Sequence, residues 1–103
     1  MICVTFRERE GVLYGFTVQG HAGAAAAGHD IVCAAVSSAA YMAANTLTEI
    51  CRCGAVAEAR DGFMQVTVQD GGVSRDILAG LHLHLSQLQL QYPQRIAIEI
   101  TEV

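Results

Sequence analysis

The sequence has few basic residues and no lysine. Its six basic residues are all arginines, scattered at positions 7, 9, 52, 60, 75 and 95, and ten acidic residues bring the formal net charge to −4. Scattered arginines form no basic stripe of the kind that contacts nucleic-acid phosphates. We therefore expect no direct nucleic-acid binding, and the negative charge favours a basic partner.

Long apolar runs and a targeting signal are also missing. No uninterrupted apolar run reaches the roughly 18–20 residues that a bilayer-spanning helix needs. The segment from Met1 to Arg7 lacks the charged start and long apolar centre of a signal peptide. These absences predict a cytoplasmic protein that has no membrane partner.

Cysteines are present, but not in a metal-binding pattern. The four cysteines include one close pair, Cys51 and Cys53, and a zinc site would need two further ligands that no second pair supplies. His82 and His84 stand two apart on a predicted helix, so they cannot share a face. We expect no metal and no cofactor. We also expect no disulfides, with Cys3, Cys51 and Cys53 packed in the core.

The composition predicts one domain over residues 1–103. Hydrophobic residues make up 52% of the 103 residues, which is ample for a core. Two runs rich in strand-forming residues, 1–7 and 12–19, flank a charged turn, and 55–60 and 63–69 flank the turn signal Asp61-Gly62. Both patterns predict β-hairpins.

Helical spacing follows each hairpin. Apolar residues predict a helix from about Ile31 to about Cys51, with Gly54 near its end. A leucine stripe predicts a second helix from Ser74 to Tyr92, after a break at Gly71-Gly72, and alternating isoleucines between 96 and 100 predict a last strand. The order ββαββαβ indicates an α+β fold: a two-layer domain with one mixed sheet of about five strands and two helices.

One cysteine falls where a helix begins. If Asp30 is the N-cap, Cys33 is the third helical residue, beside unpaired N–H groups and the positive end of the helix dipole. The pKa of a free cysteine is about 8.5, and such a position with a nearby imidazolium lowers it to roughly 3.5–7.5. His21, in a glycine-bracketed loop twelve residues earlier, can supply that imidazole. The pair has the minimum equipment of a cysteine hydrolase.

The same residues carry a family resemblance. The run Gly20-His21-Ala22-Gly23, a short loop, then Gly28-His29-Asp30-Ile31-Val32-Cys33-Ala34-Ala35-Val36-Ser37 resembles the signature of the ribosomal-processing cysteine protease family, Prp. The resemblance covers nearly the whole chain, up to the Gln91-Tyr92-Pro93 segment before the last strand.

The resemblance implies a small cytoplasmic endopeptidase, usually homodimeric, with a Cys/His dyad. Such enzymes remove the N-terminal extension of large-subunit ribosomal protein twenty-seven, cutting after an aromatic residue and before a small one. By motif, Cys33 is the nucleophile and His21 the base. His29 is a second imidazole four residues from the thiol, and we expect His21, not His29, to be essential.

Supporting roles follow from position. Gly20, Gly23 and Gly28, with His29, form a substrate loop whose glycines allow closure over an extended peptide. Asp30 caps the helix and is a less favoured candidate for orienting His21. Ser37 lies one turn beyond Cys33, where its hydroxyl can bond near the thiol or to the backbone. The Cys33 N–H is a candidate oxyanion donor if Asp30 leaves it free.

Two other functions compete with the peptidase. The chain can be a non-catalytic ribosome-associated binding protein, with the histidine loop as its recognition element. It can also be a thiol redox protein, in which Cys33 reacts with peroxide or thioesters rather than peptides. Leu83 and Leu90, the leucines left outside the helical stripe, and the alanine-rich helix suit a homodimer contact.

Overall fold

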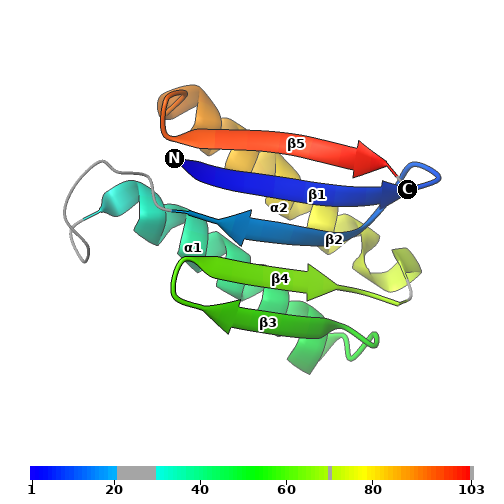
Figure 1. Cartoon of the computed structure of the whole chain (residues 1–103). Coiled ribbons are helices and arrows are strands. Elements are labelled where there is room, and N and C mark those ends of the chain that lie inside the picture. The colour runs from blue at the N-terminus through cyan, green and yellow to red at the C-terminus, as the bar shows by residue number, and fades with distance from the viewer. Residues whose placement is uncertain (21–29, 70, 103) are drawn as a thin grey trace.

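The computed structural model describes residues 1–20, 30–69 and 71–102. Two helices lie on one face of a five-stranded sheet, and the other face is open (Figure 1). The elements are, in order, β1 (Ile2–Arg9), β2 (Val12–Gln19), α1 (Ile31–Asn45), η1 (Thr46–Ile50), β3 (Val56–Arg60), β4 (Phe63–Thr67), α2 (Gly71–Gln91) and β5 (Ile96–Glu102). The predicted order ββαββαβ and the α+β class are confirmed.

The sheet is mixed, with strand order β3-β4-β2-β1-β5. β1 pairs antiparallel with β2 and parallel with β5, and the β2–β4 and β3–β4 pairs are antiparallel. Side chains alternate between the two faces of each strand. In β1, for example, Ile2, Val4 and Phe6 are buried under the helices and Cys3 is exposed on the open face.

The core lies between the sheet and the two helices. Phe6 and Phe16 pack with their ring centroids 6.1 Å apart, and Phe6 also meets the His82 ring edge-on at 5.0 Å. The predicted leucine stripe of α2 is buried at Leu78, Leu81 and Leu85. The core also includes, from α1 and η1, Val32, Val36, Ala40, Ala43, Ala44 and Leu47.

Three expectations about local structure were wrong. Cys3 is exposed rather than in the core, because its place in β1 turns it to the open face of the sheet. The second helix begins at Gly71, three residues before Ser74. Gly71 and Gly72 therefore lie in its first turn, although glycine has a low helix propensity.

The third difference is at the end of the first helix, which does not continue as an α-helix to Cys51. Thr46 begins a five-residue π-helical segment, and its hydroxyl donates to the Met42 carbonyl at 2.7 Å. The Cys51 N–H then bonds five residues back to the Thr46 carbonyl at 2.8 Å. A threonine that bonds back to the preceding turn competes with the regular ladder and loosens it.

Helix Ile31–Ile50 is long and apolar enough to cross a membrane by length and composition. The absence of an uninterrupted apolar run therefore did not exclude such a helix, because small and weakly polar residues fill the gaps. Its buried residues, including Val32, Val36 and Leu47, belong to the core between the helices and the sheet. About 33% of the apolar window is buried in this way.

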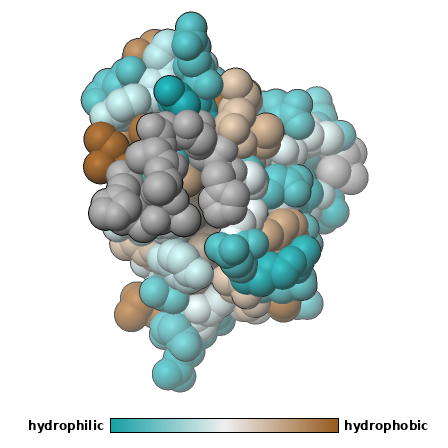
Figure 2. All heavy atoms as spheres, turned by 60° about the vertical axis from the view of Figure 1, so that its left-hand side comes forward, coloured by the Kyte–Doolittle hydropathy of each residue, from teal (hydrophilic) through white to brown (hydrophobic). Residues whose placement is uncertain are grey.

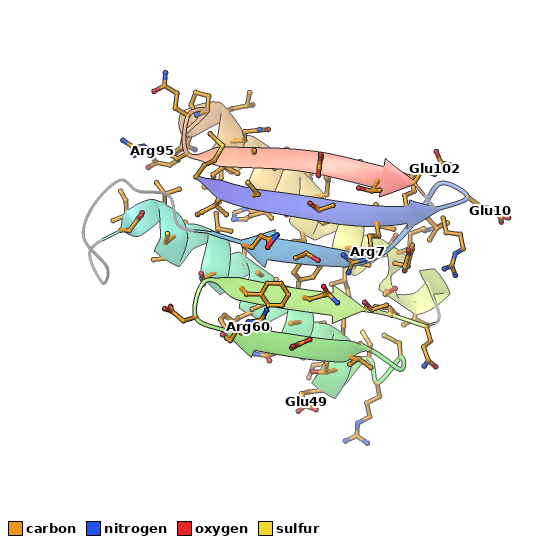
Figure 3. All side chains as sticks on the ribbon, viewed as in Figure 1. Arg7, Glu10, Glu49, Arg60, Arg95 and Glu102 are labelled. Atoms are coloured by element: carbon orange, nitrogen blue, oxygen red, sulfur yellow. The ribbon has the colours of Figure 1, made fainter. Side chains whose placement is uncertain are left out.

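The open face of the sheet is polar and carries Arg7 (Figure 3). The Arg7 guanidinium donates to the Val66 carbonyl at 2.9 Å, the Phe16 carbonyl at 3.2 Å and the Thr17 hydroxyl at 2.7 Å. It lies over Gly15, where an added Cβ would stand 2.6 Å from the Val66 oxygen. Gly15 is thus the residue that makes room for this arginine.

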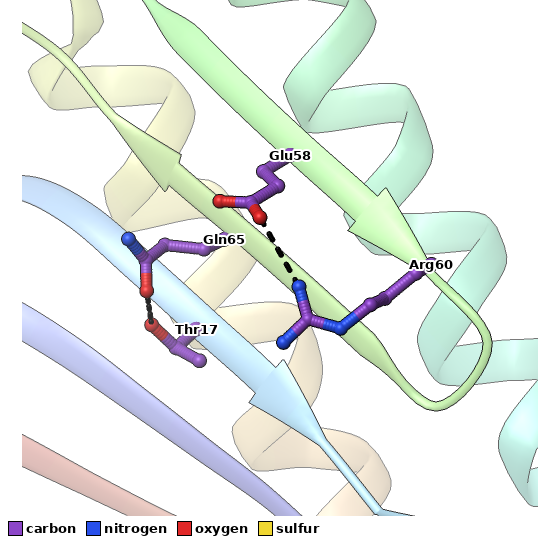
Figure 4. Close-up of polar contacts among 4 residues, drawn as sticks. All are labelled: Thr17, Glu58, Arg60 and Gln65. Atoms are coloured by element: carbon purple, nitrogen blue, oxygen red, sulfur yellow. Dashed lines mark hydrogen bonds and ion pairs between the residues drawn. The ribbon is translucent and has the colours of Figure 1, made fainter.

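Further polar pairs continue across the same face (Figure 4). Thr17 bonds to Gln65 at 3.4 Å, and Arg60 pairs with Glu58 at 3.1 Å. The Arg60 guanidinium also lies 3.9 Å from the centre of the Phe63 ring. Both charged side chains of the ion pair are mostly exposed, so it adds little stability.

Candidate active site

Asp30 fixes where α1 begins and therefore where Cys33 lies. Its backbone is extended (φ −85°, ψ 102°), and its Oδ1 accepts from the N–H groups of Val32 at 2.9 Å and Cys33 at 3.0 Å. This is the geometry of an N-cap aspartate. The prediction that Asp30 caps the helix, with Cys33 in its first turn, is confirmed.

The second oxygen of the same carboxylate contacts the thiol. Cys33 Sγ donates to Asp30 Oδ2 at 3.3 Å, and the half-buried Cys33 side chain also packs against the hydrophobic core. The sequence reasoning missed this contact.

The helix dipole and the Asp30 carboxylate act on the thiol in opposite directions. The helix dipole favours a thiolate, typically by about 0.3–1 kcal/mol. A carboxylate opposes it: two unit charges at the 3.3 Å separation of Sγ and Oδ2 repel by roughly 5 kcal/mol at an effective dielectric of about 20. Of these two effects that of the carboxylate is larger, and it favours the neutral thiol that donates to Oδ2.

The Cys33 N–H was a candidate oxyanion donor only if Asp30 left it free. The structure shows that Asp30 Oδ1 accepts from it. The next N–H, of Ala34, bonds to the Asp30 carbonyl at 3.1 Å. In this arrangement the Cys33 N–H is engaged by the cap.

Most of the predicted substrate loop lies outside the described residues. This applies to the predicted base His21 and to Gly23, Gly28 and His29. Gly20 is described: it has φ +93°, and an added Cβ would stand 2.5 Å from the Met1 carbonyl oxygen. Its N–H bonds to the Gly62 carbonyl at 2.9 Å. This position requires glycine for its backbone conformation and for the close approach of Met1.

The remaining candidates lie on the two helices α1 and α2. Ser37 is exposed, one turn after Cys33. His82 is half-buried against Phe6, and His84 is exposed. Within residues 1–20, 30–69 and 71–102, no three His, Cys, Asp or Glu side chains form a group that could hold a metal ion.

A groove of about 830 Å³ lies between α1 and α2. Its apolar lining includes Ala39 and Met42 from α1, with Ile77 and Leu81 from α2, and Cys33 is not among the lining residues. The groove is therefore a feature of the helix layer, separate from the thiol. Figure 2, turned toward the end where β2 ends and α1 begins, shows hydrophobic residues in separate groups among hydrophilic ones.

Comparison with known proteins places the chain in one family. The family model described as cysteine protease Prp matches residues 1–97. No curated protein sequence matches.

Several solved structures share the fold. The essential ribosomal processing protease Prp from S. aureus, in complex with a covalently linked product peptide, has 23% identity and a TM-score of 0.91, over 98% of this chain and 100% of that one. The same S. aureus protease with a substrate peptide has 22% identity and a TM-score of 0.85, with the same coverage. SMU.848 from Streptococcus mutans has 27% identity and a TM-score of 0.81, over 100% of this chain and 96% of that one.

Proposed function

Because this chain belongs to the Prp family of cysteine proteases, we propose that it is an endopeptidase with Cys33 as nucleophile and His21 as base. The observation that carries the assignment is the place of Cys33, in the first turn of α1 beside its cap. A cysteine at a helix N-terminus is in a setting that supports nucleophilic chemistry once its proton has been removed.

The proposed reaction has two halves. The Cys33 thiol gives its proton to His21, and the thiolate attacks the scissile carbonyl carbon to form a tetrahedral intermediate. The intermediate collapses to a thioester as the C–N bond breaks, and the amine leaves with the proton from His21. Water then adds to the thioester, the C–S bond breaks, and the carboxylic acid and the free thiol are released.

We propose the N-terminal extension of large-subunit ribosomal protein twenty-seven as the substrate, cut in the cytoplasm after an aromatic residue and before a small one. The similar S. aureus protein is a ribosomal processing protease that has been seen with substrate and product peptides. The net charge of −4 suits a basic ribosomal protein.

A cleavage assay tests the proposal. The wild type and Cys33→Ala are incubated with a peptide that copies the extension of the host's ribosomal protein, and the products are read by mass spectrometry. We expect a single cut by the wild type and none by Cys33→Ala, because alanine has no nucleophilic atom. No cut by either protein, with binding of the peptide retained in both, would indicate a binding protein instead.

We also propose that the enzyme is a homodimer that associates through its helix layer. Leu83 and Leu90 are 60% and 83% exposed on α2, and Met42 of α1 is 64% exposed at the edge of the groove between the helices. Burial of these side chains against a second copy of the chain would remove their apolar surface from water.

A further inference from the structure

One carboxylate engages both polar groups of Cys33. Asp30 Oδ1 accepts from its N–H at 3.0 Å, and Oδ2 accepts from its thiol at 3.3 Å. We propose that Asp30 is a resting-state latch, which holds the Cys33 thiol protonated in the free enzyme and must release it before peptide cleavage. The inference rests on the proposed role of Cys33 as the nucleophile.

The carboxylate holds the thiol proton and does not remove it. In model peptides, the pKa of an aspartic acid side chain is about four to five units below that of a cysteine thiol. A proton shared by Sγ and Oδ2 therefore stays on sulfur. Asp30 is a positioning residue in this arrangement, and the base that takes the proton must be another group, which we have proposed to be His21.

The cap holds the latch in place. Because Oδ1 accepts from two first-turn N–H groups, the carboxylate plane is fixed, and Oδ2 remains directed at the third helical residue. The first turn itself carries no acidic residue, so the carboxylate at the cap is the negative charge that α1 places beside the thiol. Release breaks the Sγ–H···Oδ2 hydrogen bond, after which the proton passes to the base and the electron pair stays on sulfur.

Alkylation by iodoacetamide measures the latch without any substrate. The thiolate displaces iodide to form a thioether, and the reagent is neutral, so the charge of residue 30 does not attract or repel it. Peptide mass spectrometry at pH 7 gives separate rates for the four cysteines. The exposed Cys3 serves as an internal reference, and the Cys33/Cys3 rate ratio is the measured quantity.

Asp30→Asn is the test variant, because asparagine caps a helix as well as aspartate but carries no negative charge. We expect the Cys33/Cys3 ratio to rise by roughly tenfold. Removal of a nearby negative charge commonly lowers the pKa of an acidic group by about one unit or more, and the thiolate fraction rises accordingly. Glu49→Gln is the matched control, since it removes the same charge from the far end of the same helical segment (Figure 3). The control should leave the ratio unchanged.

A ratio within twofold of the wild type, or below it, in Asp30→Asn would overturn the latch. A residue that served only as a cap would give this result, since the cap is preserved. If circular dichroism shows that Asp30→Asn does not fold, Asp30→Ser provides the same test with another strong capping residue. Because no peptide is cleaved, the outcome is independent of whether the proposed ribosomal substrate is correct.

Discussion

Gly15 illustrates how a single residue can have a role that its type alone does not reveal. Its missing side chain leaves the space in which the Arg7 guanidinium reaches the Val66 carbonyl. An alanine here would place Cβ 2.6 Å from a backbone oxygen and 2.7 Å from the arginine nitrogen. The contact can be relieved only by a shift of the strands.

We predict that Gly15→Ala lowers the free energy of unfolding by about 1–3 kcal/mol, the usual cost of overpacking. The measurement is urea denaturation followed by circular dichroism. Gly80→Ala is the matched control: Gly80 lies within α2, nothing stands within 4 Å of its added Cβ, and alanine should stabilise the helix by about 0.5–1 kcal/mol. Equal effects of the two substitutions would contradict this account.

The two histidines of the predicted substrate loop, His21 and His29, give a second prediction at the residue scale. We predict that His21→Ala reduces kcat for peptide cleavage by roughly 10²-fold or more, the usual contribution of a general base. His29→Ala should retain most of the activity. The steady-state cleavage assay compares them, and the reverse pattern would transfer the role of base to His29.

Part of the site could be predicted from residue types. An aspartate followed by apolar, alanine-rich sequence is an N-cap signal, so Asp30 and the first-turn position of Cys33 followed from sequence. The direction of the thiol did not, because it depends on a side-chain rotamer that the packing of α1 on the core selects. The sequence thus located Cys33 in the first turn of the helix and left the hydrogen-bond partner of its thiol undetermined.

At the scale of an element, the first hairpin was also predicted only in part from the sequence. A charged turn between β1 and β2 was predicted, and the structure narrows it to Glu10 and Gly11, at φ 52° and φ 79°. Both values are positive, as in a type I′ turn, which favours Asn-Gly. Glu10 occupies this turn at a cost, because a side chain with a Cβ is disfavoured in the left-handed region.

We predict that Glu10→Asn raises the free energy of unfolding by about 0.5–1 kcal/mol, since asparagine tolerates the left-handed conformation better. Thermal unfolding monitored by circular dichroism would show this as a higher Tm. Glu8→Asn makes the same chemical change inside β1, where asparagine is a poor strand former, and should give no gain. A lower Tm in Glu10→Asn would show that the left-handed conformation of Glu10 does not destabilise the turn.

Element boundaries were less predictable than the elements themselves. Hydrophobic periodicity identified both helices, because the buried stripe repeats through each of them. It did not detect the change to a π-helix at Thr46, the residue whose hydroxyl donates to the Met42 carbonyl. Periodicity reports the face that is buried, whereas the hydrogen-bond register also depends on individual polar groups.

At the scale of the whole molecule, the sequence predicted two layers and left the order of the strands open. The two hairpins place β1 beside β2 and β3 beside β4. The pairing of β2 with β4 and of β1 with β5 joins segments that are far apart in the sequence, and local patterns do not determine it. Covering only one face with helices leaves the outer surface of α1 and α2 available for contact, including Leu83 and Leu90.

We predict that Leu83→Glu and Leu90→Glu convert the proposed dimer to a monomer, because a buried unpaired carboxylate is costly at an apolar contact. Sedimentation velocity across a range of concentrations measures the association. Val56→Glu is the control: Val56 is also an exposed apolar residue, 66% accessible, but it lies on edge strand β3. A wild type that is monomeric at all concentrations, or dissociation in Val56→Glu alone, would refute the proposed interface.

The parallel pairing of β1 with β5 has a consequence for synthesis on the ribosome. β1 is made first, yet one of its two edges bonds to residues 96–102, as in the pair Ile2↔Ile96. The nascent chain can form its hairpins early, but β1 remains an unprotected edge until β5 has left the exit tunnel. Such long sequence separation slows folding and leaves strand edges open to wrong partners. Of the five strands, the last to be synthesised is thus the one that covers the free edge of the first.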